Sequence, residues 1–121
     1  MRTYRDLLVW QKSMDLVSFA YKITRDFPKE ELYGLTSQLR RCAVSIPSNI
    51  AEGYARQSTP DFLRFLKISN GSLFEFQTQI EIAFNLEYID RQQFEKLFNA
   101  SREVERMLSS LIRKISQSES Y

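Results

Sequence analysis

Hydrophobic positions recur along the chain at intervals of three and four residues, the spacing that puts side chains on one face of an α-helix. The clearest case is segment 35–56, in which an apolar or small series runs beside a polar one. The first series is Leu39, Ala43, Ile46, Ile50 and Gly53, and the second is Gln38, Cys42, Ser45, Asn49, Glu52 and Arg56. Two such lines on one helix predict two neighbours, one packed through apolar contacts and the other through hydrogen bonds.

The same periodicity predicts four helices, at about residues 5–25, 36–56, 60–87 and 91–116. Thr36 and Thr59 are expected as N-caps of the second and third helices, and Asp90 with Gln93 as a capping box for the fourth. Because the connections are short, consecutive helices are expected to be antiparallel. We therefore predict one all-α domain over residues 1–121, an antiparallel up-down-up-down four-helix bundle.

The third predicted helix carries more apolar residues than a bundle helix needs. Outside its core stripe it has Leu63, Phe65, Ile68, Phe74, Ile82, Phe84 and Leu86. One apolar face suffices for packing in a bundle, and surplus apolar surface usually marks a contact with a partner. We therefore expect self-association with Leu63, Phe74 and Phe84 in the oligomer interface. The alternative is that these side chains face solvent or the next helix.

Composition excludes most catalytic and metal chemistry. The 121 residues include no histidine and one cysteine, which rules out an internal disulfide, histidine-based catalysis and the common zinc sites. Cys42 is interpreted as a small packing residue, although the neighbouring Arg40 and Arg41 could lower its thiol pKa. We expect no enzyme activity, no cofactor and no metal. No apolar run approaches a membrane span and no secretory signal is present, so a cytoplasmic protein without membrane contact is expected.

The net charge of +2 is too small to predict a nucleic-acid partner by itself. A modest basic patch is nevertheless predicted from Arg40, Arg41, Arg56, Arg64 and Lys67, each contributing to phosphate binding. The alternative is that Arg40 and Arg41, which point about 100° apart on a helix, do not act together and that one of them pairs with Glu52.

The polar line of segment 35–56 is interpreted as structural. Its proposed structural members are Gln38, Ser45, Asn49 and Glu52. Glu52 is expected to be partly buried and held by a hydrogen bond or an ion pair rather than to act as a catalytic acid. Gly53 is expected to lie opposite Gly71 and to allow the second and third helices to approach closely.

Three segments, VWQKSMDLV, FPKEELYGLTSQLRRCAVSIPSNIAEGYAR and FLRFLKISNGSLFEFQTQI, resemble the four-helix-bundle proteins encoded in intervening sequences of bacterial 23S rRNA genes. The resemblance extends from about Leu8 to Ile115. It implies a bundle that assembles as a ring-like homopentamer, with no assigned activity, catalytic residue or cofactor. The family is also distantly similar to the accessory variability protein of diversity-generating retroelements, which binds nucleic acid and a reverse transcriptase through a basic bundle surface.

Two functional hypotheses follow. The first is a non-enzymatic oligomeric scaffold that binds nucleic acid, either RNA, a ribonucleoprotein or DNA, through the basic residues. The second is a scaffold for protein–protein interactions with no role in nucleic-acid binding. The periodicity predicts the architecture well, but no residue motif selects between these two functions.

Overall fold

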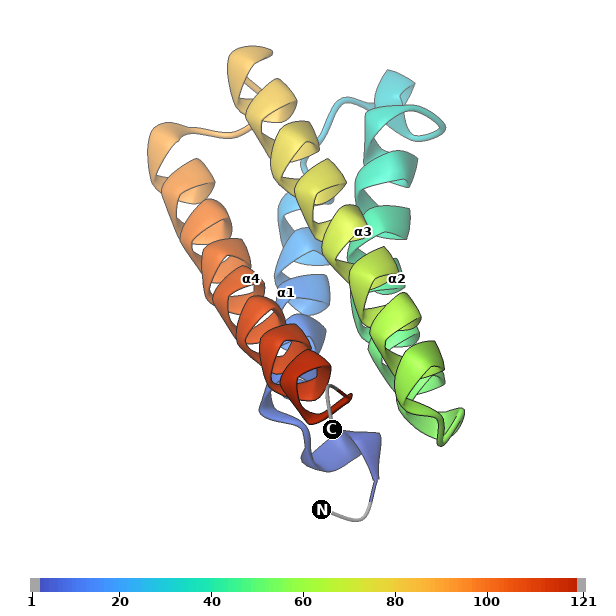
Figure 1. Cartoon of the computed structure of the whole chain (residues 1–121). Helices are drawn as coiled ribbons and strands as arrows, with labels where there is room; N and C mark the ends of the chain where they lie inside the picture. The colour runs from blue at the N-terminus through green and yellow to red at the C-terminus, as the bar shows by residue number, and fades with distance from the viewer. Residues whose placement is uncertain (1–2, 120–121) are drawn as a thin grey trace.

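Four long helices account for most of the chain in the computed structural model, which describes residues 3–119 (Figure 1). They are α1 (Leu8–Thr24), α2 (Leu35–Ala55), α3 (Thr59–Asn85) and α4 (Arg91–Glu119), with short 3₁₀ turns at Tyr4–Asp6 and Lys29–Glu31. Each helix packs against the helices before and after it, and α1 also packs against α4. The predicted all-α, up-down-up-down bundle is confirmed.

The apolar series of α2 forms one wall of the core. Leu39, Ala43, Ile46 and Ile50 are at most 1% exposed, and Gly53 is buried as well. The other helices contribute an equivalent buried stripe, which includes Leu16 and Ala20 of α1, Leu66, Leu73, Phe76 and Ile80 of α3, and Leu97, Val104 and Leu108 of α4. Apolar burial along the whole bundle axis is the main source of stability in such a fold.

The start of α2 differs from the prediction. The helix begins at Leu35, and Thr36 is buried in its first turn rather than capping it. The Leu35 N–H instead donates to Glu31 Oε1 at 3.0 Å, and the Tyr88 hydroxyl donates to Glu31 Oε2 at 2.8 Å. These two hydrogen bonds stabilise the carboxylate and lower the pKa of Glu31, the larger effect coming from Leu35. Glu31 thus links the α1–α2 connection to the α3–α4 connection.

The start of α3 also shifts by one residue. Ser58 is the N-cap, with its Oγ accepting from the Asp61 N–H, while Thr59 and Pro60 lie in the first turn. By contrast, the capping box of α4 is confirmed. The Gln93 N–H donates to Asp90 Oδ1 at 2.7 Å, and the Asp90 N–H donates to Gln93 Oε1 at 3.0 Å.

Close approach of α2 and α3 depends on Gly53, but not on the partner expected. A Cβ on Gly53 would lie 2.6 Å from the Phe65 Cβ and 3.1 Å from Phe62 Cδ1, whereas a Cβ on Gly71 would meet no atom within 4 Å. Gly71 therefore faces away from α2, and the expected pairing of the two glycines is wrong. No helix within residues 3–119 combines the length and the apolar character needed to cross a bilayer.

Candidate nucleic-acid and protein interfaces

The five basic residues predicted as one patch fall into separate groups. Arg40 faces α1, where its Nε donates to Thr24 Oγ1 at 2.8 Å and its guanidinium lies 4.6 Å from the centre of the Tyr21 ring. Arg40 and Arg56 are 16 positions apart on the same helix, a separation of roughly 24 Å. Arg40 therefore stabilises the packing of α1 on α2. Arg41, the next residue of α2, is exposed.

The other three predicted cations gather around the α2–α3 turn. The guanidinium groups of Arg56 and Arg64 both lie over the Phe65 ring, 5.2 Å and 4.5 Å from its centre. Their carboxylate partners are Glu52 at 3.9 Å and Asp61 at 3.7 Å, and all four side chains remain about half exposed. Exposed ion pairs of this kind contribute about 0–1 kcal/mol to stability. A phosphate group can therefore replace the carboxylates as the partner of the two arginines. Glu52 is exposed rather than partly buried, which corrects the expectation for this residue.

The bundle topology brings further cations to the end of the bundle where the α2–α3 turn lies. These cations are distant from the turn in the sequence and were not predicted as part of the patch. Figure 1 places the N-terminal segment, the α2–α3 turn and the C-terminal part of α4 at the same end of the bundle. We call this the basic end and define it by Arg5, Arg56, Arg64, Lys67 and Arg113. Among the side chains that the structure describes, the carboxylates there are Asp6, Glu52 and Asp61, and each already accepts a hydrogen bond or forms an ion pair.

The opposite end of the bundle carries no such excess of cations. Its carboxylates are Asp26, Glu30, Glu31, Glu81, Glu87, Asp90 and Glu95, against the cations Lys22, Arg25, Lys29, Arg40, Arg41, Arg91 and Lys96. We call it the acidic end because more carboxylates gather here than at the basic end. Because alternate connections of an antiparallel bundle meet at the same end, this difference between the two ends is visible only after the helices are placed. The net charge of +2 does not reveal it.

The polar line of α2 faces α3, as a hydrogen-bonded neighbour requires. The hydroxyl groups of Ser45 and Ser72 share a hydrogen bond of 2.9 Å, and Asn49 Nδ2 donates to the Ser45 carbonyl at 2.8 Å. Ser69 Oγ donates to the Ile46 carbonyl at 2.8 Å. Gln38, at the start of this line, is exposed.

Cys42 belongs to the same seam between α2 and α3. Its Sγ lies 3.5 Å from Glu75 Oε2 and donates a hydrogen bond to it. Burial and this neighbouring carboxylate raise the pKa of Cys42 to about 11. The alternative of a thiol pKa lowered by the neighbouring arginines does not hold, and Arg40 is directed toward α1. A protonated thiol is a poor nucleophile, so Cys42 is a packing residue that donates a hydrogen bond.

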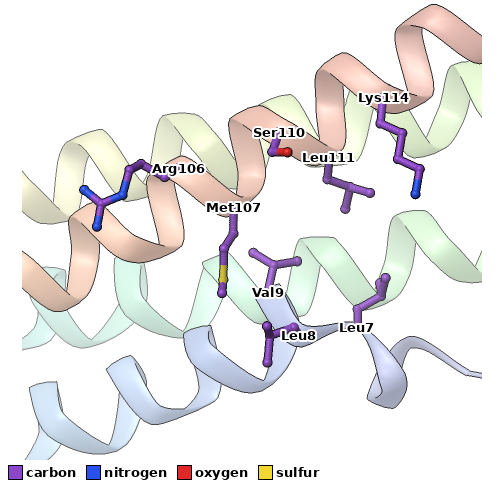
Figure 2. Close-up of a pocket in the computed structure, with 8 residues that line it drawn as sticks. All are labelled: Leu7, Leu8, Val9, Arg106, Met107, Ser110, Leu111 and Lys114. Carbon is purple, nitrogen blue, oxygen red and sulfur yellow. The ribbon is translucent and has the colours of Figure 1, made fainter.

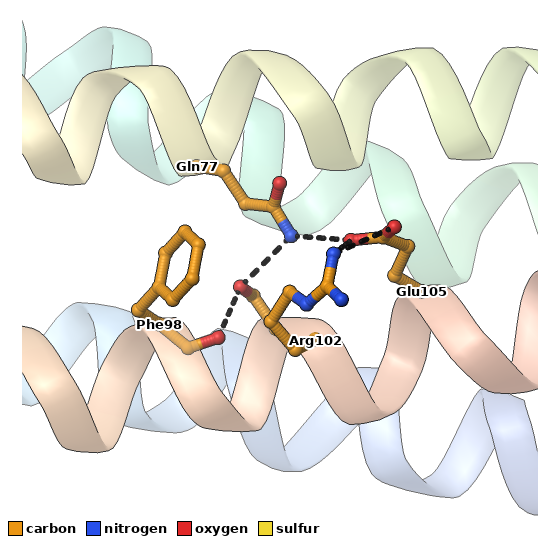
Figure 3. A network of polar contacts seen from close by, with 5 residues as sticks. Gln77, Phe98, Arg102 and Glu105 are labelled. Carbon is orange, nitrogen blue, oxygen red and sulfur yellow. Dashed lines mark hydrogen bonds and ion pairs between the residues drawn. The ribbon is translucent and has the colours of Figure 1, made fainter.

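A second polar seam, between α3 and α4, was missed by the sequence reading (Figure 3). Gln77 Nε2 donates to Ser101 Oγ at 3.2 Å and to Glu105 Oε1 at 3.0 Å, and Arg102 binds the same carboxylate at 3.1 Å. Ser101 also donates to the Phe98 carbonyl at 2.6 Å. Isolated glutamine and serine residues on a predicted helix give no sign of a shared partner, so only the packed helices reveal this network.

The three residues predicted for the oligomer interface differ in accessibility. Leu63 is only 7% exposed within the chain, so it cannot contribute much to a contact between copies, which corrects that prediction. Phe84 is half-buried and stacks on Phe94 with ring centres 5.0 Å apart. Phe74 is 47% exposed and lies on the outer side of α3. The other exposed large apolar residues of this outer face are Ile68, Ile82 and, just after the helix, Leu86.

A second exposed apolar surface lies between α1 and α2. It is a groove of about 340 Å³ whose apolar lining includes Trp10, Met14, Val17, Val44 and Pro47. Trp10 and Val17 are partly buried and pack against the core, whereas Met14 is 42% exposed. These two exposed apolar surfaces lie on different sides of the bundle.

Similar proteins identify the family of this chain. The family model described as 23S rRNA-intervening sequence protein matches residues 5–110. The chain belongs to this family. A solved structure from Bacteroides thetaiotaomicron, described as a protein with unknown function from the S23 ribosomal protein family, is 29% identical with a TM-score of 0.82. The match covers 88% of this chain and 96% of that chain. No curated protein matches the chain.

Membership of the 23S rRNA-intervening sequence protein family confirms the resemblance noted from the three sequence segments. The similarity to the solved structure extends over nearly its whole length and supports the same arrangement of helices. Neither description names an activity. The homopentamer and the nucleic-acid partner implied by the resemblance remain predictions.

Proposed function

We propose that this protein is a non-enzymatic scaffold that assembles with copies of itself and binds RNA through the basic end of the bundle. The observation that carries the proposal is the excess of cations over carboxylates at the basic end, where the α2–α3 turn lies at the same end of the bundle as the start of α1 and the C-terminal part of α4. The description of the family, 23S rRNA-intervening sequence protein, favours RNA over DNA.

The geometry of Arg56 and Arg64 suits phosphate binding. Both guanidinium groups are held over one aromatic ring, which restricts their motion, and both stay exposed. A guanidinium can donate two parallel hydrogen bonds to a phosphate, and a pre-positioned side chain loses less entropy on binding. Lys67 and Arg113 add charge without ion pairs among the described residues. Such a surface binds RNA with strong dependence on salt.

The test is a pair of charge reversals with equal net charge. Arg56→Glu combined with Arg64→Glu should weaken binding of a fluorescein-labelled structured RNA hairpin at least tenfold at low salt. It should also reduce the magnitude of the slope of log affinity against log salt concentration by about two. Each lost phosphate contact lowers the magnitude of this slope by about one. Fluorescence anisotropy over a salt series measures both quantities.

The matched control reverses two exposed cations at the acidic end, Arg25→Glu with Lys29→Glu. This variant should keep at least half of the wild-type affinity. Wild-type protein that does not bind the hairpin at low salt would refute RNA binding, and equal losses in the two variants would refute the role of the basic end.

Self-association rests on a different observation, the two exposed apolar surfaces. The outer face of α3 and the α1–α2 groove differ in shape and in residues, so contact between them is head-to-tail rather than self-complementary. Head-to-tail contacts close into rings when the rotation between copies allows it. Should the RNA tests fail, a scaffold for protein partners is the alternative function that these surfaces favour.

Phe74→Glu combined with Ile82→Glu should shift the protein to a smaller species in sedimentation velocity. Helicity should stay within about a tenth of the wild-type value by circular dichroism, because both side chains lie outside the core. Tyr33→Glu is the control, since Tyr33 is an exposed aromatic residue in the α1–α2 connection. Identical sedimentation of wild type and the double variant would contradict the proposed interface. Phe84→Glu is unsuitable because it would also break the stacking on Phe94.

A further inference from the structure

A groove separate from the surfaces described above runs between the start of α1 and the C-terminal part of α4 (Figure 2). Its volume is about 380 Å³. Leu7, Val9, Met107 and Leu111 provide apolar walls, and Ser110 is the uncharged polar side chain that lines it. Leu8 lies at its edge and is 55% exposed, so a large apolar side chain is left in water.

Two cations flank this apolar surface. Arg106 and Lys114 both line the groove, and they lie eight positions apart on α4, or roughly 12 Å along the helix axis. Neither forms an ion pair within residues 3–119. The two α4 carboxylates next to Arg106 in the sequence, Glu103 and Glu105, are paired with Lys12 at 3.3 Å and with Arg102 at 3.1 Å. The ends of the groove are therefore positive.

We propose that this groove binds an amphipathic helix of a partner protein that carries acidic residues about eight positions apart. Apolar side chains on one face of that helix would cover Leu8, Met107 and Leu111, and the two carboxylates would pair with Arg106 and Lys114. The spacing of the two acidic residues follows from the rise of 1.5 Å per residue in a helix, because roughly 12 Å between the two cations then corresponds to eight positions. Binding of an amphipathic helix in an apolar groove is a common mode of peptide recognition.

The shape of the groove favours a helix over the other candidates. An acyl chain needs enclosure over most of its surface, whereas this groove is open on the side where Leu8 is exposed. A bound helix leaves its polar face in water and needs no such enclosure. RNA bases need hydrogen-bonding groups, and apolar side chains form most of these walls. The inference is independent of the RNA-binding proposal, which uses other residues.

The probe is a fluorescein-labelled 18-residue helical peptide with leucine at positions i, i+3, i+4 and i+7 and two glutamates eight positions apart. A second peptide has lysine in place of both glutamates. With full-length protein, anisotropy should show micromolar binding of the glutamate peptide and at least tenfold weaker binding of the lysine peptide. Arg106→Glu with Lys114→Glu should reverse this preference, and a reversal cannot result from loss of folding.

The control variant, Arg25→Glu with Lys96→Glu, makes the same change in net charge at the acidic end and should keep the wild-type preference. The Arg56→Glu, Arg64→Glu variant should keep the wild-type preference for the glutamate peptide, which separates this groove from the two arginines on which the RNA proposal depends. Failure of the wild type to bind the glutamate peptide would overturn the proposal, whether the groove is too shallow or is covered by a second copy. Equal affinity for both peptides, or displacement of the probe by equimolar palmitate, would overturn it too.

Discussion

Replacing Ile46 with aspartate is expected to unfold the bundle. Ile46 is fully buried near the middle of α2, where it lies among core residues of the other helices. A carboxylate there would lose its hydration without gaining a cation, and a substitution of this kind costs about 4 kcal/mol or more. Total stability of a domain is only about 5–15 kcal/mol. Far-UV circular dichroism and urea unfolding should show loss of most of the helical signal or a large fall in the midpoint.

Two further variants make this result specific. Ile46→Val should cost only about 1 kcal/mol, because it removes one methylene group without adding charge. Gln38→Asp adds the same carboxylate at an exposed position of the same helix and should change stability by less than about 0.5 kcal/mol. A folded Ile46→Asp protein with wild-type stability would show that Ile46 is not in the core.

The periodic pattern was sufficient to place the core of α2. The apolar line is buried, and the middle of the polar line, at Cys42, Ser45 and Asn49, lies in the seam with α3, because the direction of a side chain on a helix depends mainly on its position in the sequence. The ends of the polar line, at Gln38 and Glu52, are exposed instead. The helix starts were less predictable. Thr36 and Ser58 both precede apolar runs, and the choice between a cap and a first-turn residue depends on groups such as Glu31, which lies outside the helix.

The candidate sites were predicted less well than the fold, and the reason is physical. Each depends on which helices meet, and a single sequence does not state this. Arg40 is directed at Thr24 of α1, while Arg56 and Arg64 share the Phe65 ring of α3. Leu63 was read as surplus surface but is buried. The charge at the two ends of the bundle combines residues from several helices and therefore follows from topology rather than from any local motif.

Substitution of the two helical glycines by alanine is expected to have opposite effects on stability. In α3, the exposed Gly71 has open space around an added Cβ, so Gly71→Ala should raise the free energy of unfolding by about 0.5–1 kcal/mol. In α2, a Cβ on Gly53 would lie 2.6 Å from the Phe65 Cβ, closer than two such atoms can approach. Gly53→Ala should therefore lower the free energy of unfolding by about 1–3 kcal/mol, since overpacking forces the helices apart.

Both substitutions add the same methyl group to a helix interior, so the gain in helix propensity is nearly equal in the two variants. The difference between them, about 1.5–4 kcal/mol, then measures how closely α2 approaches α3 beside Gly53. Urea unfolding monitored by circular dichroism at two protein concentrations gives this difference and separates it from any effect on self-association, because only the latter depends on concentration. Stabilisation by both alanines would mean that α2 and α3 are further apart at this point than the 2.6 Å contact implies.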